Sequence, residues 1–254
     1  MEADLERRFG GIARLYGAEA LERFRRAHVC VIGIGGVGSW AAEALARSAV
    51  GRITLIDLDH IVESNVNRQI HALGDEFGKA KVVAMAERIH AINPTCEVTT
   101  VEEFIAEDNL DDLLARGYDY VLDAIDQARV KAALIAWCKA HGVRLVTTGS
   151  AGGQTDPSRI RVVDLALTIQ DPLAARVRSL LRKQYQFPRA VKKKFGVECV
   201  FSEEPLTYPP SPTCEATEQA SPTGLNCTGL GSSVCVTATF GFVAASRVLA
   251  GLAQ

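Results

Sequence analysis

Three glycines, Gly33, Gly35 and Gly38, have the GxGxxG spacing directly after a short β-branched run, and the acidic Asp57 follows Gly38 by 19 residues. Glycine has no Cβ, so the backbone can turn sharply there and come close to an anionic group. An acid at this distance can reach a ribose hydroxyl group. The spacing favours a nucleotide-binding turn over a glycine-rich turn without a ligand.

The residues around this turn must form a strand, a helix and a second strand to place it. Residues 29–32 are typical of a strand covered on both faces, residues 39–48 are rich in Ala and Leu and predict a helix, and residues 52–56 predict the next strand. The free amide groups and the positive dipole end of the helix would point at the turn. A phosphate group is therefore expected there.

Two amides and two cations follow Asp57 in a polar, irregular stretch. Asn65, Asn67, Arg68 and Lys81 come after the carboxyl end of the second strand, which is where ligands bind in open α/β sheets. The two cations could neutralise a triphosphate and the negative charge that develops during nucleotidyl transfer. The alternative is a pair of ordinary surface cations. In a dehydrogenase this region usually leads straight into a helix, so the stretch favours transfer chemistry.

A second pair of acids, Asp123 and Asp126, follows a predicted central strand that begins at Tyr118 and ends at Leu122. Both acids fall on the ligand side of the sheet. An acid there is suited to holding Mg²⁺ against ATP phosphates, and we expect Asp126 to be the metal ligand. The competing role for Asp126 is that of a helix cap, because residues 130–141 are apolar and helical in pattern.

Strand and helix patterns alternate through most of the chain. This alternation predicts an α/β fold with a doubly wound, mostly parallel sheet of Rossmann type. A glycine-rich turn after residue 147 leads into one more strand. Further helices are expected over residues 5–26, 81–92, 109–115 and 234–245, and further strands over residues 97–101 and 143–147.

The composition is that of an ordinary soluble globular protein, with 254 residues, a net charge of −2 and 48% hydrophobic residues. The seven cysteines include no CxxC pair or other spacing typical of zinc, so we expect reduced thiols in a cytoplasmic protein without zinc. The start of the chain lacks the apolar core of a signal peptide. Residues 234–245 are too few to span a membrane and predict a buried helix, with peripheral membrane contact as the alternative.

Positive charge is concentrated in residues 176–195, which hold eight Lys or Arg and no acid, with Tyr185, Phe187 and Phe195 between them. In a slightly acidic chain this density predicts contact with nucleic acid. Cations would meet phosphates there, and aromatic rings would be available to stack on bases. A solvated helix face is the alternative.

A long segment with no periodicity, residues 202–226, is rich in Pro, Ser, Thr and Glu, and segments of this length are commonly lids or disordered. Cys214 lies inside it and Cys227 ends it. A thiol on a mobile loop that can close on a nucleotide site is a candidate nucleophile or acyl carrier. An unreactive thiol is the alternative.

The order of these motifs resembles a known family. The runs GIGGVG, LIDLD, SNVNRQ, GKAK and DAID follow one another as in the MoeB and ThiF group, whose members are related to ubiquitin-activating enzymes and adenylate a carboxylate. Within that group, RLYG, NRQIHAL, TTGSAGGQ, TIQDPLAA and VTATFGFVA are similar to the tRNA threonylcarbamoyladenosine dehydratases. The resemblance covers nearly the whole chain.

The resemblance implies an ATP-dependent enzyme that closes the threonylcarbamoyl group of the modified adenosine next to the anticodon into a ring, with loss of water. It also implies a homodimer, Mg²⁺, and a monovalent cation, Na⁺ or K⁺, near the nucleotide. A sulfur-acceptor protein of a cysteine desulfurase is a further candidate partner.

The resemblance assigns a role to each residue that matches a family motif. The ATP contacts are Gly33, Gly35, Gly36, Gly38, Asp57, Asn65, Arg68, Lys81 and Asp126. The catalytic residues are Arg68, Lys81, Asp126 and Cys227, and the metal ligand is Asp126. The tRNA contacts are Arg176, Arg178, Arg182, Lys183, Lys192, Lys193 and Lys194. The expected parts of the single domain are N-terminal helices (1–27), a nucleotide-binding core (28–170), a basic segment (171–200), a cysteine loop (201–233) and a C-terminal helix (234–254).

Two departures from MoeB-like enzymes favour tRNA as the substrate. The chain lacks their paired CxxC zinc ligands, and it has a basic patch where they grip the carboxyl terminus of a protein. Three other functions stay open. They are an adenylyltransferase for a sulfur carrier protein, an NAD-dependent oxidoreductase, and a tRNA-binding or sulfur-accepting protein without turnover.

Overall fold

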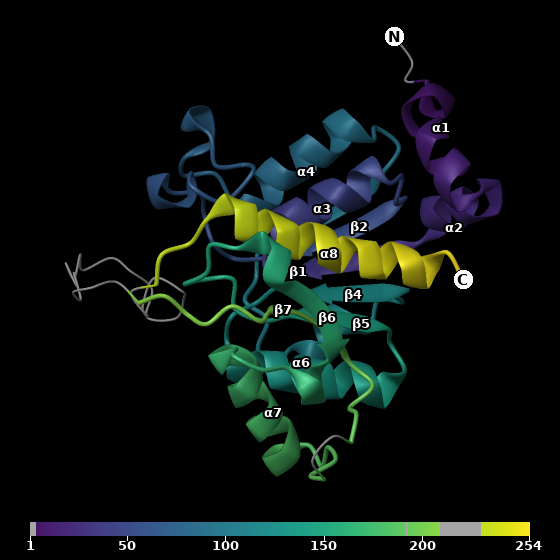
Figure 1. Cartoon of the computed structure of the whole chain (residues 1–254). Coiled ribbons are helices and arrows are strands. Elements are labelled where there is room, and N and C mark those ends of the chain that lie inside the picture. Colours follow the sequence, from purple (N-terminus) through teal and green to yellow (C-terminus); the bar gives the residue numbers. More distant parts are fainter. Residues whose placement is uncertain (1–3, 191–192, 209–229) are drawn as a thin grey trace.

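A seven-stranded sheet with the order β3-β2-β1-β4-β5-β7-β6 forms the centre of the molecule (Figure 1). The computed structural model describes residues 4–190, 193–208 and 230–254. In it, β6 runs antiparallel to β7, and the other neighbouring strands are parallel. The order grows outward from β1 in both directions, so the doubly wound, mostly parallel sheet is confirmed. The strands are β1 (His28–Ile32), β2 (Arg52–Ile56), β3 (Glu97–Val101), β4 (Tyr120–Asp123), β5 (Leu145–Thr148), β6 (Ile160–Asp164) and β7 (Glu198–Ser202).

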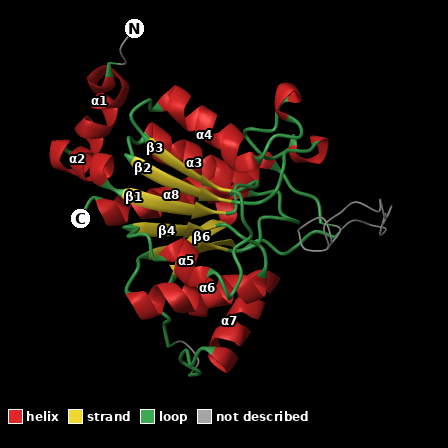
Figure 2. Ribbon diagram, turned by 180° about the vertical axis from the view of Figure 1, so that it is seen from behind, coloured by secondary structure: helices red, strands yellow, loops and turns green. Residues whose placement is uncertain are grey.

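Helices cover both faces of this sheet (Figure 2). One hydrophobic core lies between the sheet and α2, α3, α4 and α8, and a second lies between the sheet and α5, α6 and α7. The helices are α1 (Leu5–Tyr16), α2 (Ala18–Arg26), α3 (Gly38–Arg47), α4 (Lys81–Ile92), α5 (Leu110–Leu114), α6 (Ala128–His141), α7 (Pro172–Gln184) and α8 (Val234–Leu252).

The strand β1 shows why its sequence is continuously apolar. Val29 and Val31 lie in the core under α3 and α8, whereas Cys30 and Ile32 lie in the core under α6. Successive side chains of a strand point to opposite faces, and here both faces are covered by helices. The turn that follows Ile32 is therefore anchored by a strand that is buried on both sides.

The C-terminal helix α8 has 19 residues and is part of the core, as predicted, although it continues to Leu252 rather than ending at residue 245. It packs so closely on α3 that a Cβ added to Gly241 would lie 2.5 Å from the carbonyl oxygen of Val37. By length and mean hydropathy (1.6) α8 could cross a membrane, but half of this apolar stretch is buried inside the protein. Its packing against α3 gives no support to membrane contact.

The strand β7 is not predicted by the sequence pattern. It lies between the basic segment and the long polar segment, where composition indicates neither core nor periodicity. Its residues Cys199, Val200 and Phe201 are nevertheless buried between β5 and β6. The basic segment is also helical only as far as Gln184, where α7 ends.

We expect Gly241→Ala to lower the free energy of unfolding by roughly 1–3 kcal/mol, because the added methyl group would collide with the backbone of α3. Chemical denaturation followed by circular dichroism measures this change. Gly74→Ala is the control, since a Cβ at Gly74 would meet no atom within 4 Å. An unchanged denaturation midpoint for Gly241→Ala would contradict the close packing of α3 and α8.

Candidate nucleotide-binding site

The loops that follow β1, β2 and β4 meet at the carboxyl end of the sheet, where Figure 2 shows many of the connecting loops. These loops carry the glycine turn (residues 33–38), Asp57 and the DAID sequence with Asp126. The three strands are neighbours in the sheet. The predicted elements of the site are thus brought to one edge, which is the ligand side of a doubly wound fold.

The glycine turn needs its first and last glycines for different reasons. Gly33 has φ of 85°, a conformation that residues with side chains rarely adopt. A Cβ at Gly38 would lie 1.8 Å from the carbonyl oxygen of Gly33, so α3 can begin here only with glycine. The start of α3 therefore lies directly behind the turn, where its amide groups favour an anion.

Asp57 is oriented by two backbone amides. Its Oδ2 accepts a hydrogen bond from the Ile34 N–H (2.6 Å), and its Oδ1 accepts one from the Asp59 N–H (2.8 Å). Burial raises the pKa of Asp57, and the nearby Lys81 ammonium group opposes that rise. A carboxylate has about four acceptor positions, so a ribose hydroxyl group can still donate to this one.

Arg68 lies against the glycine turn. A Cβ at Gly36 would come within 3.2 Å of Cγ and Cδ of Arg68, so Gly36 makes room for its stem. The guanidinium group donates to the Ser64 carbonyl oxygen (2.7 Å) and to Asn67 Oδ1 (2.9 Å), and the Trp40 indole donates to the Arg68 carbonyl oxygen (2.9 Å). Burial lowers the pKa of Arg68, but a guanidinium group stays protonated.

Asn65 shapes the turn that carries Arg68. It is buried, its Oδ1 accepts from the Val62 N–H (3.2 Å), and its carbonyl oxygen accepts from the N–H groups of Arg68 and Gln69. These bonds connect the short 3₁₀ helix Glu63–Asn65 to the turn after it. A direct contact between Asn65 and phosphate stays a prediction.

Lys81 is the first residue of α4 and is buried, with 5% of its surface exposed. Its Nζ lies 2.7 Å from Oδ2 of Asp59, two residues after Asp57. The alternative of an ordinary surface cation is therefore wrong for Lys81. The role of Asp59 was missed, although its place in the LIDLD motif was a usable signal.

Asp126 is exposed in the loop of residues 124–127, between β4 and α6. The cap position of α6 is Gln127 rather than Asp126. In the described ranges, no three His, Cys, Asp or Glu side chains are grouped so that they could hold a metal ion. Mg²⁺ is commonly held by one or two carboxylates, with water and phosphate oxygens as the other ligands, so a single acid such as Asp126 is compatible with it.

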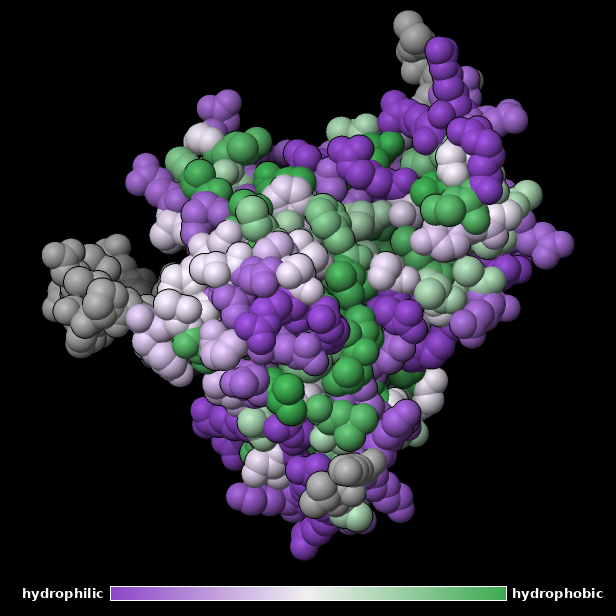
Figure 3. Space-filling view, in the orientation of Figure 1, coloured by the Kyte–Doolittle hydropathy of each residue, from purple (hydrophilic) through white to green (hydrophobic). Residues whose placement is uncertain are grey.

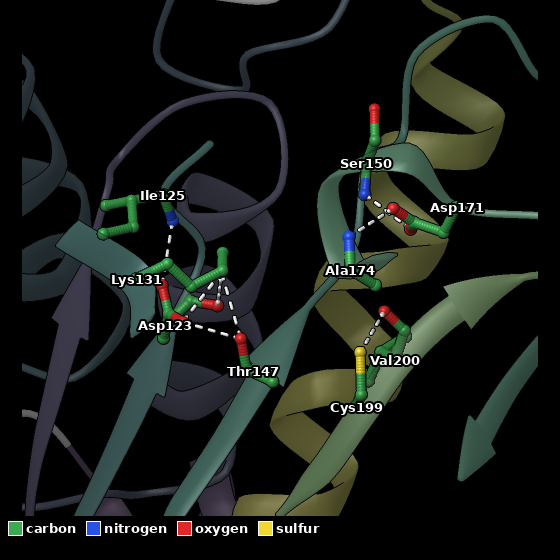
Figure 4. A network of polar contacts seen from close by, with 9 residues as sticks. All are labelled: Asp123, Ile125, Lys131, Thr147, Ser150, Asp171, Ala174, Cys199 and Val200. Atoms are coloured by element: carbon green, nitrogen blue, oxygen red, sulfur yellow. Dashed lines mark hydrogen bonds and ion pairs between the residues drawn. The ribbon is translucent and has the colours of Figure 1, made fainter. Parts of the chain in front are cut away.

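A buried ionic network beneath this loop was not predicted. Figure 4 shows Asp123, Lys131 and Thr147 pointing toward one another from β4, α6 and β5. Lys131 Nζ lies 2.7 Å from Oδ2 of Asp123, and the Thr147 hydroxyl group donates to the same oxygen at 2.6 Å. All three residues are at most 2% exposed. The sequence signal was a lysine within the apolar pattern of α6.

A second buried acid, Asp171, joins the turn after β5 to the start of α7 (Figure 4). Its Oδ1 accepts from the Ala174 N–H (2.8 Å) and so caps α7, while its Oδ2 accepts from the Ser150 N–H (2.9 Å). A Cβ at Gly149 would lie 1.8 Å from Oδ2 of Asp171. Burial raises the pKa of Asp171.

Several buried polar side chains around the glycine turn have no hydrogen-bond partner among the described residues. They include the hydroxyl groups of Ser39 and Thr237 and the side-chain oxygen of Gln69. Ser39 follows Gly38, whereas Thr237 and Gln69 lie near the Cβ positions of Gly36 and Gly35, respectively. Buried polar groups are nearly always paired, so this set indicates that water or a ligand binds beside the turn.

An open hollow of about 450 Å³ begins at Arg68. Residues 63, 64 and 66–68 line it together with residues 230–232, and the Asn67 amide donates to the Ser232 carbonyl oxygen (3.0 Å) between the two segments. The hollow is thus next to the cation expected to act on phosphate. A molecule bound in the hollow would therefore lie beside Arg68.

The basic segment presents several exposed cations: Arg176, Lys183, Arg189, Lys193 and Lys194. Many residues are hydrophilic at the end of the molecule where α7 lies (Figure 3). Arg178 and Arg182 are half-buried, and they contact Thr168 and the Phe195 ring, respectively.

The aromatic residues of this segment belong to the core. Phe195 is 5% exposed, with Phe187 packed edge-on against it at a centroid distance of 5.2 Å, and Tyr185 packs on the same cluster. The expectation that Phe195 is available to stack on bases is therefore wrong. Spacing alone could not separate an interface aromatic from one that anchors a segment to the core.

Two predicted residues, Lys192 and Cys227, lie outside the described residues, as does Cys214. Among the cysteines that are described, Cys30, Cys96, Cys138 and Cys199 are free thiols and buried. Burial raises their pKa values, so they are unreactive.

Known proteins are similar to this chain in sequence and in fold. The family model of the ThiF family matches residues 9–253. A tRNA threonylcarbamoyladenosine dehydratase of Escherichia coli is 55% identical over 246 residues, which are 95% of this chain and 92% of that protein. A crystal structure of the Escherichia coli enzyme TcdA in complex with ATP has a TM-score of 0.89 at 52% identity, and the match covers 99% of this chain and 96% of that one.

A more distant relative covers only part of the chain. The molybdopterin-synthase adenylyltransferase of Salmonella typhimurium is 34% identical over 136 residues, which are 54% of each protein.

The buried His71 gives the site a test that depends on pH. Burial lowers the pKa of His71 to about 4, with smaller contributions from Lys81 and Arg88. An unfolded histidine titrates near pH ~6.5, so the unfolded state binds more protons than the folded state between these pH values. Stability must therefore fall as the pH falls through this window.

We expect His71 to lower the free energy of unfolding by about 2 kcal/mol when the pH falls from about 7.5 to about 5. His71→Gln should remove this part of the loss, as measured by urea unfolding at both pH values. His90→Gln, at an exposed position on α4, is the control. The same acid loss in His71→Gln and in the parent protein would contradict the burial of a neutral imidazole beside Lys81.

Proposed function

This chain belongs to the ThiF family, and from that premise we propose that it catalyses the ATP-dependent dehydration of threonylcarbamoyladenosine in tRNA, which closes the threonyl substituent into a ring. The observation that carries the proposal is the arrangement of two cations around the glycine turn, one on Gly36 and one beside Asp57, which accepts a hydrogen bond from Ile34 of the turn. Arg68 packs on Gly36, and Lys81 is buried beside Asp57 and Asp59. This arrangement suits a triphosphate and the charge that develops on it during transfer.

The reaction needs ATP because a carboxylate is a poor electrophile. An oxygen of the threonyl carboxylate would attack the α-phosphorus of ATP, and the bond from that phosphorus to pyrophosphate would break. An internal nitrogen or oxygen of the same substituent would then attack the activated acyl carbon and expel AMP. The sum of the two steps is the loss of one water molecule from the substituent.

The residues of the site divide this work. The glycine turn and the start of α3 would hold phosphate oxygens, Asp57 would hold the ribose, and Arg68 and Lys81 would stabilise the charge on the transferring phosphate. The hollow beside Arg68 would receive the threonyl group. Burial of Lys81 favours this role, because a cation acts more strongly where water is excluded.

Two ions, Mg²⁺ and a monovalent cation, are proposed to bind beside the turn. Mg²⁺ would be held by Asp126 together with phosphate oxygens, and it would neutralise charge on the phosphates. A monovalent cation, Na⁺ or K⁺, would suit the neutral side-chain oxygens of Ser39, Gln69 and Thr237, which lack partners among the described residues.

The exposed cations of the basic segment, with Lys192, would contact tRNA phosphates.

A homodimer would cover apolar surface, because Figure 3 shows hydrophobic residues along much of α8, where Phe242 is 46% exposed. The protein would act in the cytoplasm, and a sulfur-acceptor protein would matter only if Cys227 forms a thioester.

Arg68→Ala should reduce product formation by at least about a hundredfold, because it removes charge stabilisation at the transferring phosphate, and should leave tRNA binding intact. Modified tRNA is incubated with ATP and hydrolysed to nucleosides, and mass spectrometry measures the loss of one water molecule from the modified nucleoside. Binding of tRNA is measured by filter retention. The complementary double variant Lys193→Ala and Lys194→Ala should weaken tRNA binding and keep ATP binding. Normal product from Arg68→Ala would refute the role given to Arg68.

The same assay separates the alternatives. A sulfur-carrier adenylyltransferase would ignore tRNA and act on a small protein. An oxidoreductase would bind a nicotinamide cofactor and leave the mass of the nucleoside unchanged. A protein without turnover would bind tRNA and show no use for ATP.

A thioester at Cys227 would make that thiol necessary for ring closure, whereas direct closure would not. If the thioester forms, Cys227→Ser should stop product formation and still allow exchange of pyrophosphate into ATP. Cys214→Ser is the matched control on the same segment. Wild-type product from Cys227→Ser would show that closure is direct.

A further inference from the structure

We infer that Lys131 is a positioning residue for the nucleotide site: its buried ammonium group, paired with Asp123, holds the loop of residues 124–127 against the glycine turn. The inference rests on the proposed function, because the loop is assigned there to nucleotide and metal. Lys131 lies one turn into α6 and is 2% exposed.

Lys131 and Asp123 form a buried ion pair that Thr147 also joins. Lys131 Nζ lies 2.7 Å from Oδ2 of Asp123, and it also donates to the Thr147 hydroxyl oxygen at 3.0 Å. The Thr147 hydroxyl group donates to the same carboxylate oxygen, while the other oxygen, Oδ1, accepts from the Ile125 N–H at 3.2 Å. One oxygen of Asp123 is thus bound to α6 and β5, and the other is bound to the loop.

The loop is also in contact with the glycine turn. A Cβ at Gly33 would lie 3.0 Å from the carbonyl carbon and oxygen of Ala124, and a Cβ at Gly38 would lie 3.4 Å from the Ala124 Cβ. Ala124 therefore packs against both ends of the turn. Any shift of the loop must shift the turn as well as Asp126, which is two residues further along the chain.

The energetics favour positioning over stability as the role of the pair. Two charges taken out of water lose solvation that their attraction only partly restores, and apolar replacements of such pairs are often as stable. The network is also fully enclosed, since Asp123 and Thr147 are 0% exposed. The ion pair instead fixes the orientation of the Asp123 carboxylate, which accepts a hydrogen bond from the loop at Ile125.

A matched pair of variants at Thr147 tests this inference. Thr147→Val keeps the shape and removes the hydroxyl group, whereas Thr147→Ser keeps the hydroxyl group. Calorimetry with MgATP should show binding about tenfold weaker for Thr147→Val and within about twofold of wild type for Thr147→Ser. Filter binding of tRNA should be unchanged in both, which a general loss of folding would not allow.

The double variant Asp123→Asn with Lys131→Met removes both charges and keeps similar volumes. It should fold, as checked by circular dichroism, and bind MgATP about tenfold more weakly. Arg88→Met is the control, because it removes a partner of the buried Glu43 between α3 and α4 and should lower stability without changing MgATP affinity.

The outcomes separate the two proposals. If wild-type protein does not bind MgATP, the proposed function fails. If wild-type protein binds MgATP and Thr147→Val binds it equally well, the positioning role of Lys131 is overturned. A double variant that does not fold leaves the decision to the pair at Thr147, whose changes are too small to unfold the sheet.

Discussion

The contact of the Gly38 backbone with the Gly33 carbonyl oxygen determines how this protein can bind an anion. Only a residue without a Cβ fits there, so α3 begins directly behind the end of β1. The amide groups at the start of α3 then face the turn, and a phosphate can approach them without a side chain between. The loop after β4 packs on the same two glycines, which joins the third neighbouring strand to the site.

The charged residues around this contact differ in burial. Asp123 and Lys131 are buried and paired with each other, and the buried Lys81 is paired with the exposed Asp59. Asp126 is exposed, as are five cations of the basic segment: Arg176, Lys183, Arg189, Lys193 and Lys194. Buried pairs keep one geometry, and exposed charges are accessible to molecules that come and go. The proposed chemistry uses both kinds of charge. Buried charges would keep the phosphate in one position during activation of the acid, and exposed charges would bind a large substrate that must later dissociate.

The sequence was sufficient for the elements with strong local signals. The predicted bounds of β2, α4 and β3 agree with those observed. The apolar residues of α4 follow the helical period, and Asn93 with Pro94 ends that helix. The glycine turn with Asp57 was also predictable, since spacing along the chain alone defines that motif.

The remaining features depend on contacts between distant residues, which spacing does not reveal. The ion pairs of Lys81 with Asp59 and of Lys131 with Asp123 form only in the folded sheet. β7 was missed because its burial comes from β5 and β6 rather than from its own pattern. The cations around Phe195 in the sequence suggest an aromatic residue at an interface. In the structure its ring is buried in the core, with Arg182 over its face and Phe187 packed edge-on against it.

The two oxygens of Asp171 hold two separate parts of the chain, the turn after β5 and the first residues of α7. The Cα of Gly149 lies so close to one of those oxygens that no side chain fits. Evolution therefore has little freedom at either position, because a substitution at one is harmful until the other has also changed. The exposed residues of α7 are free of this restriction, so they can be substituted while the junction between the two segments keeps its geometry.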